Sequence, residues 1–278
     1  MLRITEPEYI LMKKYIEEHC GIYLEKDKEY LIESRLADLL VETGCGSFQE
    51  FHLKARSEDH TGELRDRIVD AMTTNETSWF RDKNAWDYLK EAAVPMLLNL
   101  AAETGEASVW SAAASTGQEA YSLLMLLDEA VKERGQPSLL DKIEITGTDI
   151  SSSALTSAIS AQYDNIAIKR GLDREIREKY FHKSGNLWLF DQELKKRVRF
   201  EKFNLQNDFI FPDNFDLILC RYVSIYFSDT FKRELFSKMA KVLKPGGVLL
   251  LGATESLREF SDDFEISYYK STVINTRK

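Results

Sequence analysis

Apolar residues recur every three or four positions along the first seventy residues, which is the spacing of amphipathic helices. The pattern predicts four helices that begin near residues 5, 27, 47 and 64. Thr5 and Glu8 have the spacing of a capping box at the first of these starts, and Gly21 would end that helix. We therefore expect a small, all-helical N-terminal unit.

The pattern changes after one more helical stretch, over residues 86–100. From there on, short runs typical of β-strands alternate with amphipathic helical runs. Such alternation predicts a parallel, doubly wound sheet of the α/β class. The predicted strands are 107–112, 143–149, 215–220 and 248–252, and the helices between them are 119–134 and 229–243, the second followed by a turn over 244–247.

Residues 160–200 fit the alternation poorly. Two runs, 186–190 and 197–200, have the pattern of paired strands. They predict a hairpin beside the main sheet, within an inserted β subdomain over about 180–203.

The division of the chain follows from these patterns. We expect an N-terminal helical domain over 1–72 and a larger domain over 73–278. No proline or glycine linker lies near residues 72–80, so the two domains should pack together.

Apolar stretches along the chain are short. The longest, such as 94–98 and 248–251, fall far below the roughly 20 residues that cross a bilayer. No signal for export opens the sequence, so we expect a cytoplasmic protein without membrane insertion. The net charge of −9 would repel a polyphosphate backbone, which argues against nucleic acid as a partner.

Cysteine and histidine residues are few and scattered. Their spacing fits neither a disulfide framework nor a zinc site, so we expect reduced cysteines and no bound metal. They are Cys20, Cys45 and Cys220, and His19, His52, His60 and His182.

Ligands of open α/β sheets bind beyond the carboxyl ends of the strands. After the first strand comes a loop of small residues, 113–119, which would let a ligand approach the backbone, although an ordinary tight turn has the same composition. The second strand ends in Asp149, which could accept hydrogen bonds from ribose hydroxyls or cap the next helix near Ser151. Because Gly117 is the loop's single glycine, a pyrophosphate turn is disfavoured, and a nucleoside without phosphates such as S-adenosylmethionine fits better.

A third group of polar and aromatic side chains lies at the junction of the two domains. Residues 73–81 combine several hydrogen-bonding side chains with two aromatic rings and Arg81. The segment suits a wall of a ligand site, and equally a capped helix start with a buried aromatic pair.

In these motifs the chain resembles the CheR family of chemotaxis receptor glutamate O-methyltransferases, over nearly its whole length. The junction is similar to the family's T-x-N-E-T-x-F-F-R element, with Trp79 in place of the first phenylalanine. The other matching motifs are Cys20-Gly21-Ile22, Ser34-Arg35-Leu36, Trp110 to Ser122, Asp149-Ile150, Asn204-Leu205, Cys220-Arg221, Ile225-Tyr226-Phe227, Leu243 to Gly247 and Glu255-Ser256.

The resemblance implies a Rossmann-like methyltransferase sheet with a helical N-terminal domain and an inserted β-hairpin subdomain. It implies transfer of a methyl group from S-adenosylmethionine to glutamate carboxylates on cytoplasmic helices of methyl-accepting receptors, by a protein that we expect to be monomeric, with S-adenosylhomocysteine as product. Arg81 would orient the acceptor carboxylate, and Tyr226 would hydrogen-bond near the reacting oxygen. The cofactor contacts would be Asn75, Thr77, Arg81, Glu119, Asp149, Asn204, Leu205, Tyr222 and Val223.

Some features depart from the family pattern. Tyr222 stands where the family usually has asparagine, and its ring could stack on the adenine base or fill the space of the base. The first 72 residues hold 10 lysine and arginine against 16 aspartate and glutamate, an unfavourable balance for glutamate-rich receptor helices. A regulatory CheR-like binding module without catalysis, or a methyltransferase for a different carboxylate, remains the alternative.

Overall fold

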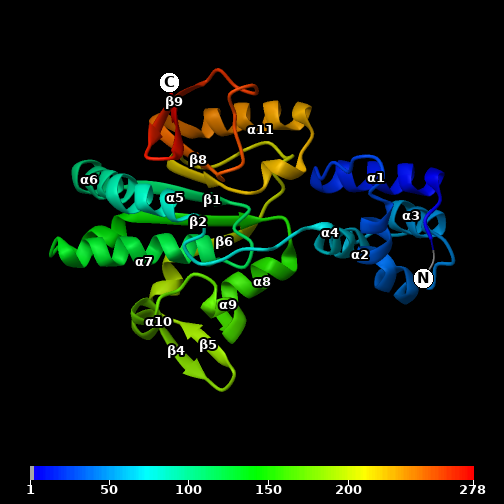
Figure 1. Ribbon diagram of the computed structural model, residues 1–278, viewed down its shortest axis with the longest axis horizontal. Helices are drawn as coiled ribbons and strands as arrows, with labels where there is room; N and C mark the ends of the chain where they lie inside the picture. Colours follow the sequence, from blue (N-terminus) through cyan, green and yellow to red (C-terminus); the bar gives the residue numbers. More distant parts are fainter. Residues whose placement is uncertain (1–2) are drawn as a thin grey trace.

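Four helices form the N-terminal part of the protein in the computed structural model, which describes residues 3–278 (Figure 1). Their apolar faces enclose one core, in which Met12, Ile32 and Phe51 are fully buried. The predicted capping box is present, since the Glu8 carboxylate accepts a hydrogen bond of 2.8 Å from the Thr5 amide, and Gly21 ends the first helix with a φ of +73°. The helices are α1 (Glu6–Cys20), α2 (Glu29–Glu42), α3 (Phe48–Ser57) and α4 (Glu63–Met72).

A seven-stranded sheet lies at the centre of the larger part of the molecule, in the order β6-β2-β1-β7-β8-β10-β9. The predicted strands are confirmed as β1 (Ala107–Ala112), β2 (Ile143–Asp149), β7 (Phe215–Cys220) and β8 (Leu243–Leu251), all parallel to their neighbours among these four. The pattern did not reveal the antiparallel edge pair, β9 (Phe264–Tyr269) and β10 (Thr272–Arg277).

Helices cover both faces of this sheet, with α11 above it and α7 below it in Figure 1. Neighbouring residues on a strand point to opposite faces, so Val109 packs with α7 in one core and Trp110 packs with α11 in the other. The helices of this part are α5 (Lys83–Tyr88), η1 (Leu89–Ala93), α6 (Val94–Thr104), α7 (Gln118–Glu133), η2 (Pro137–Lys142), α8 (Ser152–Ser160), α9 (Asn165–Lys169), α10 (Arg174–Tyr180), η3 (Leu194–Arg197), η4 (Ser224–Tyr226) and α11 (Asp229–Val242). None of the helices among residues 3–278 is long and apolar enough to cross a membrane.

The inserted β subdomain is a three-stranded antiparallel sheet, in the order β3-β5-β4, that lies below the main sheet in Figure 1. Its strands are β3 (Gln162–Asp164), β4 (Phe181–Ser184) and β5 (Leu187–Phe190). The predicted pairing of 186–190 with 197–200 was wrong. The second run belongs to β6 (Val198–Lys202), which pairs with β2 in the main sheet. Alternation along a strand indicates which face is buried, but it carries no information about the partner strand.

The predicted turn over 244–247 lies inside β8 as a bulge. Leu243 pairs with Phe215, whereas the next paired residues are Val248 and Leu217, so the additional residues loop out of the ladder. Gly246 accommodates the loop with a φ of +78°.

Candidate active site

A cleft lies beyond the carboxyl ends of β1, β2 and β7, next to the end of α1. All of the residues that the sequence predicts for the site line this cleft. They are Asn75, Thr77, Arg81, Glu119, Asp149, Asn204, Leu205, Tyr222, Val223 and Tyr226.

The loop after β1 forms the floor of the cleft with its backbone. Ala113 and Ser115 have φ angles of +59° and +53°, in the left-handed region that side chains beyond glycine rarely adopt. Gly117 follows with a φ of +91°, and a Cβ atom there would lie 3.1 Å from Ala158. Strained backbone of this kind is concentrated at functional sites. The loop is thus more unusual than the ordinary tight turn that its composition also allowed.

Asp149, the last residue of β2, is 6% exposed at one side of the cleft. Its two carboxylate oxygens accept hydrogen bonds from the amides of Ser115 (2.8 Å) and Ser151 (2.9 Å). Burial raises the pKa of Asp149, and the two amide donors only partly oppose this shift. The carboxylate therefore supports the start of α8, whose N-cap is Ser151. Each carboxylate oxygen of Asp149 can still accept a further hydrogen bond from a ligand. The contact with ribose hydroxyls stays a prediction.

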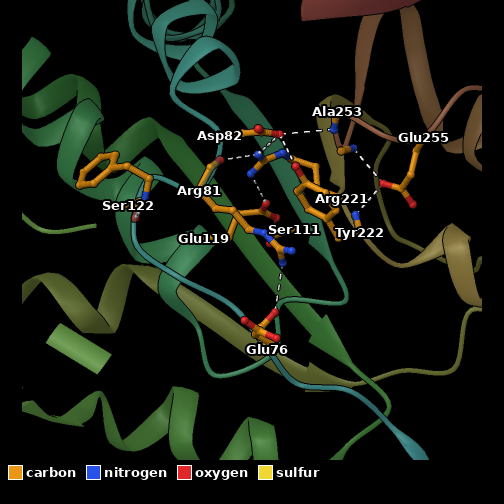
Figure 2. Close-up of polar contacts among 12 residues, drawn as sticks. Glu76, Arg81, Asp82, Ser111, Glu119, Ser122, Arg221, Tyr222, Ala253 and Glu255 are labelled. Carbon is orange, nitrogen blue, oxygen red and sulfur yellow. Dashed lines mark hydrogen bonds and ion pairs between the residues drawn. The ribbon is translucent and has the colours of Figure 1, made fainter. Parts of the chain in front are cut away.

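Glu119 lies in the first turn of α7 and is held by buried partners (Figure 2). Its oxygens accept hydrogen bonds from the Ser111 hydroxyl (2.8 Å) and from Nη1 of Arg221 (2.9 Å). The side chains of Arg221 and Glu119 are only 2% and 12% exposed. This ion pair is thus desolvated, and its geometry fixes the position of both charges.

Asp82 forms the next link of the same network (Figure 2). Its Oδ2 atom accepts hydrogen bonds from the Tyr222 hydroxyl (2.6 Å), from Nη2 of Arg221 (3.3 Å) and from the amide of Ala253 (3.3 Å). Burial and the Asp82 carboxylate together raise the pKa of Tyr222. Asp82 has a φ of +76°, so this residue too is held in the left-handed region.

Arg81 reaches into the cleft over the ring of Tyr222. Its guanidinium carbon lies 3.7 Å from the ring centroid, within the range of a cation–π contact. Its Nη1 atom donates a hydrogen bond of 3.1 Å to the carbonyl of Glu76. The structure thus places the Tyr222 ring against Arg81.

The junction segment between α4 and α5 crosses the cleft as an extended loop. The Ser115 hydroxyl donates to the carbonyl of Asn75 (2.8 Å), and the Asn75 amide donates to the Ser151 hydroxyl (3.2 Å). Trp79 is 1% exposed and makes an edge contact with Tyr163 of the β subdomain. The alternative of a buried aromatic here is therefore right for Trp79, but the segment is not a helix start.

The N-terminal helices close the remaining side of the cleft. The Asn204 amide donates to the carbonyl of His19 (2.9 Å), and the Gln206 amide donates to the carbonyl of Glu17 (2.9 Å). Both side-chain amides thus donate to backbone carbonyls in the last turn of α1. Asn204, predicted as a cofactor residue, thus also joins the two parts of the molecule. Tyr226 accepts a backbone hydrogen bond of 2.8 Å from Tyr23 in the same contact.

Several residues that shape the site were not singled out from the sequence. Glu255 is 7% exposed and accepts backbone hydrogen bonds from Gly252 (2.8 Å) and Ser224 (2.8 Å). Arg35 of α2 donates to the carbonyl of Thr73 (3.2 Å) and to the Thr74 hydroxyl (2.9 Å). Glu255 and Arg35 lie in motifs of the resemblance, but only the structure shows which groups their side chains bind. Asp82 and Gln206 stood in no motif.

Comparison with known proteins assigns both parts of the chain to one family. The family model described as "CheR methyltransferase, all-alpha domain" matches residues 7–73, and "CheR methyltransferase, SAM binding domain" matches residues 75–273. The second model agrees with the prediction of S-adenosylmethionine as the cofactor.

Relatives of similar length match along almost the entire chain. The chain is 40% identical to chemotaxis protein methyltransferase 1 of Pseudomonas aeruginosa over 262 residues, which cover 93% of each protein. It is 39% identical to the chemotaxis protein methyltransferase of Vibrio parahaemolyticus, over 95% of this chain and 94% of that protein. The corresponding Listeria monocytogenes protein is 30% identical over 94% of this chain and 95% of its own length. The chain belongs to the CheR methyltransferase family.

Proposed function

We propose that the protein transfers a methyl group from S-adenosylmethionine to glutamate side-chain carboxylates of chemotaxis receptors or related signalling proteins. The products would be glutamyl methyl esters and S-adenosylhomocysteine. The observation that carries the proposal is the position of Arg81, a guanidinium held in the cleft that also contains the residues expected to bind the cofactor. The names of the relatives support chemotaxis receptors as the substrates.

The lining of the cleft suits S-adenosylmethionine in its chemistry. The cleft is concave and is lined by small and apolar side chains together with a few polar groups, as small-molecule sites usually are. Small side chains at Ala113, Ala114 and Ser115 let a ligand approach the backbone, and Asp149 offers carboxylate oxygens for ribose hydroxyls. When bound, the cofactor supplies a methyl group that its sulfonium already activates.

The reaction makes modest demands on the protein. A glutamate carboxylate is ionised at neutral pH, because its reference pKa is about 4.3, so no general base has to remove a proton. The protein has to orient the acceptor and exclude water. In this proposal Arg81 presents its planar donor edge to the acceptor carboxylate, and Tyr226, which lines the same cleft, hydrogen-bonds near the reacting oxygen.

A regulatory module without catalysis is the second candidate. The chemistry of the cleft disfavours it, since the positive charge of Arg81 lies in the same cleft as the residues expected to bind the cofactor. We further expect the protein to act as a monomer in the cytoplasm, where the receptor helices that it would methylate are found.

The test is a methyl-transfer assay with labelled S-adenosylmethionine and cytoplasmic receptor fragments from the same organism. Label should enter the receptor and be released as methanol by mild base, as expected for an ester. Replacing the acceptor glutamates of the fragment by alanine should abolish labelling. Arg81→Ala should lower kcat/KM by about 100-fold or more, the scale of a lost orienting charge, while Lys196→Ala, at an exposed position, should match the wild type. Binding of the cofactor without any transfer to receptor fragments would refute the proposal and favour the regulatory module.

A further inference from the structure

Tyr222 has a backbone conformation that tyrosine rarely adopts, with a φ of +59°. Asparagine is much more common in this region than an aromatic residue is. The conformation is maintained by Glu255, which accepts a hydrogen bond from the Tyr222 amide, and by close packing against Gly252. A Cβ atom at Gly252 would lie only 3.0 Å from the Tyr222 ring. The surroundings thus fix both the backbone and one edge of the ring.

The far end of the ring is fixed as well. The Tyr222 hydroxyl donates a hydrogen bond of 2.6 Å to Asp82, which in turn accepts from the buried Arg221. Figure 2 shows Tyr222 between the carboxylates of Asp82 and Glu255. Such a ring has little freedom to rotate, and it offers one stable face to the cleft.

Arg81 depends on that face for its position. Within residues 3–278 no carboxylate forms an ion pair with Arg81, and one hydrogen bond, to the carbonyl of Glu76, holds its guanidinium. The ring of Tyr222 is therefore its main support, at 3.7 Å. Stacking uses the face of a guanidinium and leaves its N–H edge free to bind a carboxylate.

We propose that Tyr222 is a positioning residue, which holds the guanidinium of Arg81 in the orientation that receives the acceptor carboxylate. The inference rests on the proposed function and assigns to Tyr222 a role toward the acceptor instead of the cofactor. The hydrogen bond to Asp82 serves to fix the ring, and the ring serves to fix Arg81.

Two variants separate the ring from its hydroxyl. Tyr222→Asn removes the ring but suits the left-handed backbone, so the fold should be kept. It should lower kcat/KM for the receptor fragment by about 10-fold or more, mainly through KM, because a cation–π contact that is partly desolvated contributes on that scale. Tyr222→Phe keeps the ring and should retain kcat/KM within about threefold of the wild type. A single hydrogen bond at a partly exposed site contributes little net free energy. Cofactor affinity, measured by calorimetry, should change little in either variant.

A double-mutant cycle decides whether Tyr222 acts through Arg81. In an Arg81→Ala background, Tyr222→Asn should lower kcat/KM by less than about twofold further, because residues that act as a unit are not additive. Fully additive losses, or a loss of cofactor affinity equal to the loss of kcat/KM, would overturn the proposal and assign the ring to the cofactor pocket or to the fold.

A spectroscopic measurement tests the contact without reference to catalysis. The Arg81 Nε–H signal should be shifted upfield by the ring current in the wild type and in Tyr222→Phe, and should return to an ordinary value in Tyr222→Asn. An Arg81 signal that does not respond to loss of the ring would refute the positioning role. If the wild type shows this shift yet methylates no receptor fragment, the proposed function fails and the contact itself stands.

Discussion

Two carboxylates at neighbouring corners of the cleft, Glu119 and Asp149, are kept in place in opposite ways. Glu119 has a buried counter-charge in Arg221 and a hydroxyl donor in Ser111. The hydrogen-bond partners of the Asp149 carboxylate are two backbone amides, of Ser115 and Ser151, and neither carries a charge. Burial of Asp149 outweighs its amide donors and raises its pKa.

The comparison suggests different tasks for the two groups. A carboxylate that is fully paired by an arginine contributes to the architecture of the site. A carboxylate held only by amides keeps acceptor capacity, and a ligand with hydroxyl donors can add to its solvation. We therefore expect loss of the Glu119 pair to affect stability most, and loss of the Asp149 charge to affect cofactor binding most.

The largest effect should come from Arg221→Met. It leaves Glu119 buried without a counter-charge and should reduce the free energy of unfolding by about 3–5 kcal/mol, measured by denaturant titration. Combining it with Glu119→Gln should restore part of the loss, because the unpaired charge is then gone. The exposed Lys196→Ala serves as the control, with no measurable change expected. A cost below about 1 kcal/mol would mean that solvent screens this pair as it does at a surface.

The next effect concerns Asp149→Asn and should appear in the affinity for S-adenosylmethionine. Loss of charged hydrogen bonds should weaken binding by about 10-fold to 100-fold, measured by calorimetry. Because the pKa of Asp149 is raised, the wild-type affinity should begin to fall at a higher pH than for an exposed aspartate, while the weak affinity of the variant stays flat. Parallel pH profiles for both proteins would contradict an ionised Asp149 in the complex.

Stability should respond to this group in the opposite direction. A folded pKa above the unfolded value means that the protonated form favours the fold. The contribution of Asp149 to stability is thus full below its unfolded pKa and is lost as the pH rises through the folded pKa. The free energy of unfolding of the wild type, relative to Asp149→Asn, should therefore increase as the pH is lowered.

The smallest effect should come from Ser111→Ala, which removes one donor from Glu119 and leaves the ion pair intact. A hydrogen bond to a charged, buried group contributes about 1.5–3 kcal/mol, and the retained pair should keep the loss near the lower value. Ser108→Ala, the same substitution at the start of the same strand, should cost less. Thermal unfolding of the two variants compares them directly, and equal shifts in Tm would argue against a specific role for the Ser111 hydroxyl.

Much of this architecture could be predicted from periodicity and capping. The four N-terminal helices, the central strands and the end of α1 at Gly21 follow from local patterns, because each element forms by its own spacing of apolar residues. The hairpin error shows where such reasoning ends. Residues 198–202 were recognised in part as a strand, but their partner is β2, about fifty residues earlier in the chain.

The sequence by itself determined the class of the protein, since strand ends, small loop residues and the motif at 73–81 identify a CheR-type methyltransferase. Only the tertiary structure decided how the site works as a unit. Asp82, Arg221 and Tyr222 form one network through contacts that span up to 140 residues of chain, with φ angles that local preference disfavours at two of the three. Pairings of this kind depend on where distant segments meet, and a residue's spacing along the chain does not encode them.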